Sequence, residues 1–176
     1  MKKAEIIKRA KQIRAVVADV DGVLTDGSII YCSDGKEIKG FNVQDGLAAQ
    51  LARRAGIKIF LVSGRSSQAV WRRSREMAVE RLWQGAADKE NVFDIIKKNY
   101  SLKPAQICYI GDDLPDLKLL LRSGLAVAVP GASEEVRKAA ALVTTRRGGR
   151  GVLREVIEII LKAQGKWKNV LQSYMC

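Results

Sequence analysis

The chain has 176 residues and a net charge of +12, from 31 basic and 19 acidic side chains. This length suffices for one domain that buries about 70% of its unfolded surface, so residues 1–176 are expected to form a single domain without disulfide or metal support. Histidine is absent, which excludes histidine-based catalysis and histidine-bound metals. The three widely spaced cysteines (Cys32, Cys108 and Cys176) indicate neither a disulfide framework nor a thiolate metal site.

Residues 1–14 are rich in lysine, and basic side chains interrupt their apolar residues, so we expect no export signal. No segment approaches membrane-spanning length, and the cysteines are typical of a reducing compartment, which together predict a cytoplasmic protein. The positive charges are spread over predicted helices and are not interleaved with tryptophans. This pattern favours a solvated basic surface over a site for nucleic acid or membrane.

Apolar runs alternate with helical patterns along the chain, which is typical of a Rossmann-like α/β fold, a parallel sheet flanked by helices. Strands are predicted at residues 15–18, 58–62, 107–110 and 125–129, with a shorter one near Leu82. Amphipathic helices are predicted at residues 46–55, 67–78, 91–100, 116–122, 134–141 and 151–163.

Two segments depart from this alternation. Residues 28–41 contain two strand-like runs on either side of Ser33-Asp34-Gly35, which predicts an inserted β-hairpin. The tail, residues 164–176, carries several apolar side chains but is too short to form a core of its own. We therefore expect both segments to pack against something else.

Paired carboxylates follow the first predicted strand. Asp19 and Asp21 stand where an open α/β sheet places its ligands, and Gly22 permits a turn that brings both carboxylates and a backbone carbonyl around one point. A divalent cation held there would neutralise a phosphate beside Asp19.

Other strand ends supply complementary groups. Asp112 and Asp113 follow the strand at 107–110, so a third oxygen ligand for Mg²⁺ is expected at the same edge of the sheet. Ser63-Gly64-Arg65 follows another strand, and Lys89 begins a helix; Ser63 and Lys89 can bind phosphoryl oxygens. Each signal alone is ordinary turn or surface chemistry, but their joint order at four strand ends favours a phosphate site.

This set resembles the four motifs of the haloacid dehalogenase superfamily of phosphatases. The resemblance implies that Asp19 is the nucleophile, Asp21 the general acid and base, and Asp112 a metal ligand beside them. It also implies that Ser63, Gly64 and Lys89 bind phosphate and that Mg²⁺ is the cofactor. The chemistry of the residues agrees, because a carboxylate nucleophile gives an aspartyl-phosphate and a nearby carboxyl can protonate the leaving oxygen.

A closer resemblance, to the capless 3-deoxy-manno-octulosonate 8-phosphate (KDO 8-phosphate) phosphatases, covers nearly the whole chain. The matching segments are Asp-Val-Asp-Gly-Val-Leu-Thr-Asp-Gly at 19–27, Phe-Asn-Val at 41–43, Gly-Asp-Asp-Leu at 111–114, Gly-Gly at 148–149 and Ala-Gln-Gly-Lys-Trp at 163–167. Gln44 departs from the basic residue of that family. The resemblance implies a sugar-acid phosphate substrate and a role in lipopolysaccharide biosynthesis. Arg65, next to the phosphate loop, could pair with a second anionic group of such a substrate, and Asp113 and Arg147 are further candidate substrate contacts.

Only a helix and a short strand fit between Ser63 and Lys89, so no cap domain is expected over the site. The resembled family implies a homotetramer built on the hairpins, in which the tail of one subunit reaches a neighbour's site. The basic loop of Arg146, Arg147 and Arg150 among glycines suits the binding of an anion.

Alternatives remain open at this stage. Within the enzyme class the substrate is KDO 8-phosphate, a related nine-carbon sugar-acid phosphate or a broad set of sugar phosphates. From other classes, a receiver-like phospho-signalling domain is disfavoured by the order of the motifs. A basic nucleic-acid-binding module is disfavoured by the intact set of acidic, serine and lysine residues.

Overall fold

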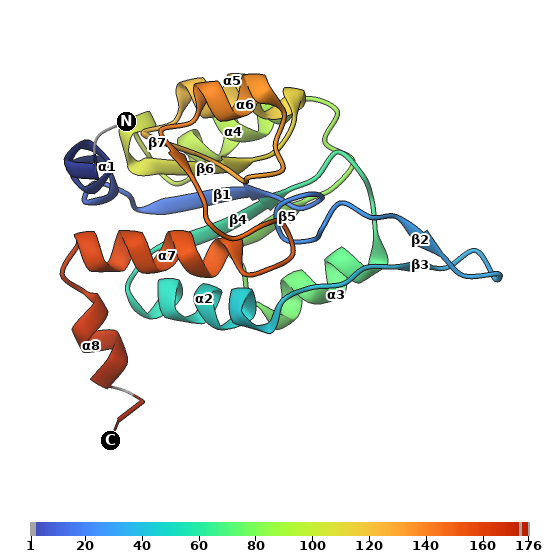
Figure 1. Ribbon diagram of the computed structural model, residues 1–176, viewed down its shortest axis with the longest axis horizontal. Coiled ribbons are helices and arrows are strands. Elements are labelled where there is room, and N and C mark those ends of the chain that lie inside the picture. Colours follow the sequence, from blue (N-terminus) through green and yellow to red (C-terminus); the bar gives the residue numbers. More distant parts are fainter. Residues whose placement is uncertain (1–2, 173, 176) are drawn as a thin grey trace.

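The computed structural model describes residues 3–172 and 174–175 (Figure 1). Six parallel strands form the main sheet in the order β5-β4-β1-β6-β7-β8. In chain order they are β1 (Ala15–Asp19), β4 (Lys58–Val62), β5 (Arg81–Trp83), β6 (Ile107–Gly111), β7 (Leu125–Ala128) and β8 (Leu142–Val143). The predicted fold class is confirmed; the two-residue strand β8 is an addition.

Helices cover both faces of the sheet. Figure 1 shows α4, α5 and α6 on one face and α2, α3 and α7 on the other. The α-helices are α1 (Lys3–Ala10), α2 (Val43–Arg54), α3 (Gln68–Glu76), α4 (Lys89–Asn99), α5 (Leu117–Arg122), α6 (Glu134–Ala139), α7 (Val152–Ala163) and α8 (Trp167–Gln172). The six predicted helices lie at the predicted places, whereas α1 and α8 were not predicted.

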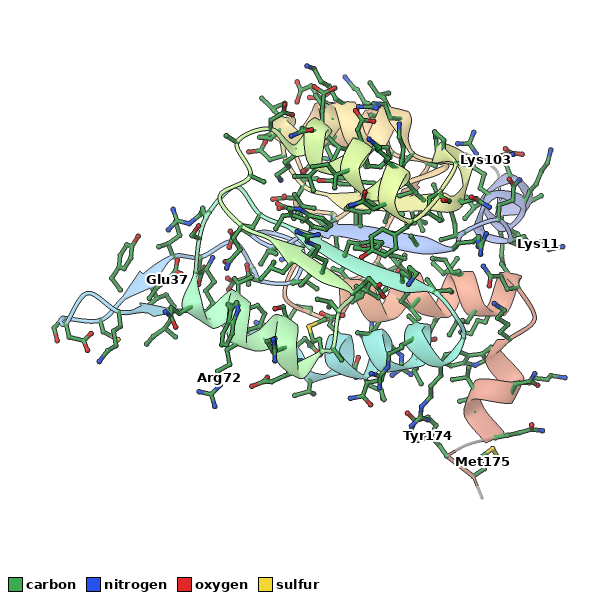
Figure 2. The ribbon with its side chains drawn as sticks, turned by 180° about the vertical axis from the view of Figure 1, so that it is seen from behind. Lys11, Glu37, Arg72, Lys103, Tyr174 and Met175 are labelled. Atoms are coloured by element: carbon green, nitrogen blue, oxygen red, sulfur yellow. The ribbon has the colours of Figure 1, made fainter. Side chains whose placement is uncertain are left out.

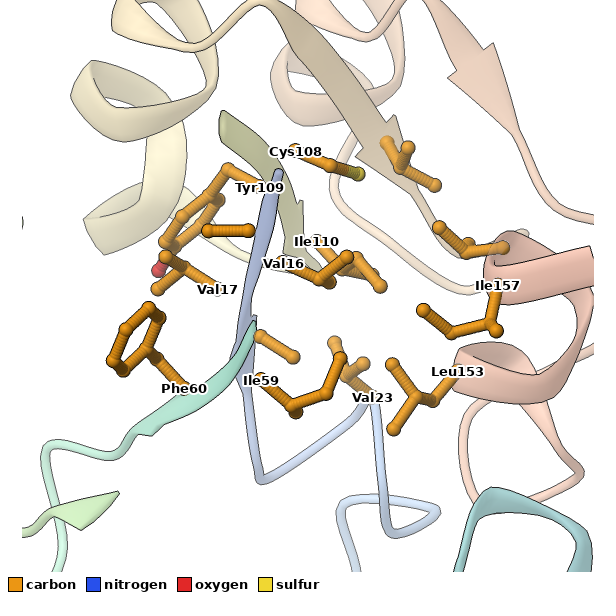
Figure 3. Packing of buried hydrophobic residues seen from close by; sticks show 14 of the residues in the cluster. Val16, Val17, Val23, Ile59, Phe60, Cys108, Tyr109, Ile110, Leu153 and Ile157 are labelled. Carbon is orange, nitrogen blue, oxygen red and sulfur yellow. The ribbon is translucent and has the colours of Figure 1, made fainter. Parts of the chain in front are cut away.

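Strand β1 is the centre of the core. All five of its residues are buried, because β4 and β6 flank it and helices cover both of its faces. Val16 and Val17 point to opposite faces, as alternation along a strand requires. In Figure 3, Val17 lies near Phe60 and Tyr109, while Leu153 and Ile157 of α7 approach from the other side. The last residue of this central strand is Asp19.

The inserted hairpin lies outside this core. It consists of β2 (Ile30–Tyr31) and β3 (Glu37–Ile38), paired antiparallel and shorter than the sequence predicts, around a turn closed by the Gly35 N–H to the Cys32 carbonyl. The hairpin projects from the body of the molecule (Figure 1), with Ile30 53% and Tyr31 63% exposed. Two strands that bury so little apolar surface are marginally stable alone.

The described part of the tail packs at the opposite end of the sheet. The Gln164 side-chain amide donates to the Ala10 and Ile13 carbonyls, which precede β1, and Val170 of α8 is buried. The aromatic ring of Trp167 lies under the charged groups of Arg154 and Lys162. This tail therefore lies far from the carboxyl ends of its own strands. Among the helices of residues 3–172, none is long and apolar enough to cross a membrane.

Candidate active site

The carboxyl ends of the parallel strands surround a cavity of about 710 Å³. Because β1, β4 and β6 run in parallel, the loops that follow them meet at one edge of the sheet. Among the residues that line the cavity are seven predicted from the sequence: Asp19, Asp21, Gly64, Arg65, Lys89, Asp112 and Asp113. Ser63 lies directly behind them, buried at the end of β4.

Asp19 is held by Lys89. The Lys89 Nζ lies 3.0 Å from Asp19 Oδ1 and 2.8 Å from Asp116 Oδ1, so one ammonium bridges two carboxylates. The Tyr109 hydroxyl donates to Asp116 Oδ1 at 2.7 Å. Asp116 is only 1% exposed and anchors Lys89 from behind. This network fixes the position of Asp19 at the floor of the cavity.

Asp112 completes a group of three carboxylates. Ligand atoms of Asp19, Asp112 and Asp116 lie within 4.8 Å of one another, and the Asp112 backbone N–H donates to Asp116 Oδ2 at 3.0 Å. Gly22 has a φ of +86°, and a Cβ at that position would collide with the Asp112 carboxylate. Glycine at this turn therefore allows Asp112 to approach the backbone that follows Asp19.

The crowding of these carboxylates changes their acidity. Burial, with a further contribution from Asp116, raises the pKa of Asp19 to about 6 although Lys89 opposes the shift. Burial, followed by the charges of Asp19 and Asp116, raises the pKa of Asp112 to about 8. Burial lowers the pKa of Lys89, but Asp19 and Asp116 outweigh it and the net shift is upward. The site thus carries an excess of negative charge that a cation would relieve.

The donors fit Mg²⁺. Carboxylate oxygens are the ligands that this ion prefers, and the group of Asp19, Asp112 and Asp116 brings them together without nitrogen or sulfur. Asp19 and Asp112 are two of the three predicted ligands. The third, Asp21, lies outside this group of described carboxylates, and one of its oxygens forms an ion pair with Lys39. The sequence also predicts a backbone carbonyl of this turn close to the same point.

Asp21 has two partners in the structure. One carboxylate oxygen pairs with the Lys39 ammonium, and the other lies 3.4 Å from the Ser63 hydroxyl. The Ser63 Oγ also accepts the Arg65 backbone N–H at 3.1 Å. The predicted phosphate loop and the predicted acid and base are therefore in direct contact.

The three candidate substrate contacts lie in different surroundings. The Arg65 guanidinium lies 3.3 Å from the Glu37 carboxylate and 3.3 Å from the Tyr31 hydroxyl, both on the hairpin. Asp113 lies at the cavity wall and accepts the Leu114 N–H at 2.8 Å, so it caps a short helix. Arg147 lines a second hollow of about 500 Å³, which shares Asp112 and Gly27 with the cavity.

Sequence reasoning missed two residues of this site. Asp116 is not among the site residues predicted from the sequence, and its contacts with Lys89 and Tyr109 place it in the site. Lys39 was not singled out, because a lysine on a hairpin normally points to solvent. The available signal was its position two residues before the Phe-Asn-Val segment, which resembles the phosphatase family.

The carboxylate group predicts a pH-dependent response to Mg²⁺. The raised pKa values of Asp19 and Asp112 mean that the folded protein binds more protons than the unfolded chain between about pH 4 and pH 8. Their contribution to the free energy of unfolding therefore falls as pH rises through this range. At pH 8, Mg²⁺ at about 100 times its Kd should add ~2.7 kcal/mol, which raises the Tm of a domain of this size by roughly 5–10 °C.

Thermal unfolding with Mg²⁺ and with a chelator measures this effect. In Asp112→Asn the Mg²⁺-dependent rise should be lost, and the metal-free variant should be more stable than the metal-free wild type at pH 8. An equal rise in the variant would show that Mg²⁺ binds elsewhere.

Comparison with known proteins identifies relatives that cover most of the chain. The model of the haloacid dehalogenase-like hydrolase family matches residues 69–156. The 3-deoxy-D-manno-octulosonate 8-phosphate phosphatase KdsC of Escherichia coli K12 is 37% identical over 163 residues, which cover 93% of this chain and 87% of the relative.

Solved structures agree with this. The Moraxella catarrhalis 3-deoxy-D-manno-octulosonate 8-phosphate phosphatase, crystallised with magnesium, phosphate and KDO, is 40% identical with a TM-score of 0.95, covering 98% of this chain and 99% of the other. The cobalt-bound phosphatase of Haemophilus influenzae is 37% identical with a TM-score of 0.86, covering 90% and 92%.

Proposed function

Since the chain belongs to the haloacid dehalogenase-like hydrolases and, among them, to the 3-deoxy-D-manno-octulosonate 8-phosphate phosphatases, we propose that it hydrolyses this sugar-acid phosphate to KDO and phosphate with Mg²⁺ as cofactor. One observation carries the proposal. Asp19, at the end of the central strand, is held by Lys89 at the floor of a cavity that Asp21 and Asp112 also line.

In the first step Asp19 attacks the phosphorus atom. The P–O bond to the sugar breaks, and Asp21, which enters this step as the protonated carboxyl group, gives its proton to the departing sugar oxygen, so that an aspartyl-phosphate and the free sugar acid result. Lys89 keeps Asp19 in place, since its ammonium lies 3.0 Å from Asp19 Oδ1. A fixed nucleophile loses little freedom when it attacks.

In the second step water hydrolyses the aspartyl-phosphate. Asp21, now deprotonated, accepts a proton from the attacking water, the bond from Asp19 to phosphorus breaks, and inorganic phosphate leaves. When bound between Asp19 and Asp112, Mg²⁺ offsets the repulsion between the phosphate dianion and the nucleophile.

The phosphoryl oxygens are bound by groups from two loops. Ser63 donates its hydroxyl, Gly64 presents its backbone at the cavity wall, and Lys89 supplies the fixed positive charge. Gly64 has no other atom near its would-be Cβ, so the approach to its backbone is open.

The sugar acid extends from this phosphate site toward basic residues. Arg65 and Arg147 are the proposed partners of its carboxylate, from the main cavity and the adjoining hollow respectively, with Asp113 as a contact to a hydroxyl. Arg65 must exchange part of its pairing with Glu37 to take this role.

A turnover panel tests the substrate. With Mg²⁺, KDO 8-phosphate should give a kcat/KM at least about tenfold above that of hexose phosphates, because the carboxylate adds a charged contact. Preference for a nine-carbon sugar-acid phosphate would keep the mechanism and change the substrate, whereas equal turnover of neutral sugar phosphates would contradict selection of the carboxylate. Repeated hydrolysis of any of these esters would exclude a receiver-like domain, which stays phosphorylated. It would also exclude a module that only binds nucleic acid.

The proposal includes assembly. We place the enzyme in the cytoplasm as a homotetramer in which the hairpins of several subunits pack together, with the tail closing a neighbour's site. The exposed Ile29, Ile30, Tyr31 and Ile38 of the hairpin support this, because their burial needs a partner. The described tail packs away from its own site, so a role of the tail in catalysis would be at a neighbour's site.

Light scattering tests the assembly. The wild type should be a tetramer at micromolar concentration, and Ile30→Lys should shift it toward the monomer by placing a charge on the proposed interface. Deletion of residues 165–176 should leave Mg²⁺ binding unchanged and lower kcat/KM. A monomeric wild type would contradict the assembly, and unchanged kinetics of the truncated enzyme would contradict the role of the tail.

A further inference from the structure

Lys39 is partly buried as a residue, but its side chain is covered completely, unlike that of an ordinary surface lysine. It directly follows β3 of the exposed hairpin, yet its side chain is 0% exposed. Its ammonium pairs with the Asp21 carboxylate and lies 3.7 Å from Glu37. A lysine loses its hydration at such a site and needs charged partners in fixed positions.

The contacts of Asp21 are unequal. The Lys39 ammonium makes a charge-assisted hydrogen bond to one carboxylate oxygen, whereas the Ser63 hydroxyl is 3.4 Å from the other. A contact of 3.4 Å is at the weak limit of hydrogen bonding. Lys39 is therefore the group that sets the orientation of the Asp21 side chain.

The base of the hairpin is itself tied to the site. Glu37, labelled on the hairpin in Figure 2, contacts both Lys39 and Arg65, and Arg65 also contacts Tyr31. These contacts join both hairpin strands to the loops after β1 and β4. The position of Lys39 thus depends on the contacts between the hairpin and these two loops.

We propose that Lys39 is a positioning residue for proton transfer, which holds the Asp21 carboxylate in the orientation that serves the leaving oxygen and the attacking water. This inference rests on the proposed function, in which Asp21 is the acid and base. The hairpin then has a second role besides assembly, because it carries the lysine that orients the acid and base.

Direct binding of substrate by Lys39 fits the structure less well. Lys39 is not among the residues that line the cavity, and its side chain has no exposed surface. Its ammonium would have to leave Asp21 to reach a phosphoryl oxygen. The geometry therefore assigns it to Asp21.

Lys39→Met, which keeps the length of the side chain and removes the charge, tests the proposal. We expect kcat to fall about 10²-fold, the range of general acid and base catalysis, with KM changed less than about threefold. The matched control is Lys36→Met on the same hairpin, whose ammonium pairs with Asp34 at the exposed tip and should leave both constants unchanged. A rise in KM with unchanged kcat would identify a substrate-binding lysine and overturn the proposal.

A double-mutant cycle separates positioning from folding. In Asp21→Asn, itself slowed about 10²-fold, Lys39→Met should cost no more than a further twofold, because both changes remove the same proton transfer. A folding or assembly defect would lower activity equally in both backgrounds, and that result would overturn the proposal.

The cycle is measured with KDO 8-phosphate and with a hexose phosphate, an alkyl ester whose leaving oxygen also needs a proton. If KDO 8-phosphate is not hydrolysed, the proposed substrate fails while the cycle on the second ester still decides the role of Lys39.

Discussion

Replacing Asp19 with asparagine is expected to lower kcat by about 10⁴-fold or more. The amide has the shape of the carboxylate but cannot attack phosphorus, and removal of a nucleophile in other enzymes has effects of this size or larger. Among the described residues, two other carboxylates lie in the same group, those of Asp112 and Asp116. Asp112 is a proposed metal ligand, and Asp116 is held by Lys89 and Tyr109, so we expect neither to replace Asp19 as the nucleophile. Steady-state kinetics with Mg²⁺ and acid-quench detection of the phosphoenzyme measure the loss.

The control is Asp34→Asn, at the exposed tip of the hairpin, which should retain full activity. Asp19→Asn should also be more stable than the wild type at pH 8 without Mg²⁺, since it removes one of the crowded charges. Residual turnover above about 1% of wild type, in protein free of deamidation, would contradict nucleophilic attack by Asp19.

Lys89→Met is expected to damage both stability and catalysis. It removes the ammonium that bridges Asp19 and Asp116, and loss of one partner from a buried ion pair typically costs about 3–5 kcal/mol. For a domain of this size that lowers the Tm by roughly 10 °C at pH 8. It also removes the fixed charge at the phosphate site, so kcat/KM should fall about 10³-fold.

Calorimetry and kinetics on the same preparation check both effects. Lys118→Met serves as the control, because Lys118 also lines the cavity but is 74% exposed and pairs with Glu90, an arrangement worth at most about 1 kcal/mol. Equal losses in the two variants would contradict a special role for Lys89.

The main sheet could be predicted from the sequence because the patterns that indicate its strands are local and strong. Four apolar runs of four or five residues, each followed by a helical pattern, leave few arrangements other than a parallel sheet. The two-residue strand Leu142–Val143 has too short a pattern to be distinguished from a loop. The helix at Lys3–Ala10 was missed because its lysines obscured the apolar face that packs on α7.

The candidate site was predictable only in part. Asp19, Asp112 and Lys89 follow strands or begin a helix, so the topology alone brings them to one edge. Asp116 and Lys39 take their positions from contacts with residues 27 and 18 positions away, which no local pattern encodes. Their burial is a property of the tertiary structure.

The contrast between the central strand and the hairpin has a consequence for hydrogen exchange. Residues 15–18 of β1 are paired with strands on both sides, so their amides should exchange only when the whole sheet opens, and the nucleophile directly follows this segment. Within one subunit the hairpin has few buried contacts and can open while the sheet stays intact. Loss of activity on mild heating should therefore begin with release of Lys39 from Asp21, in a protein whose circular dichroism is still that of the native state.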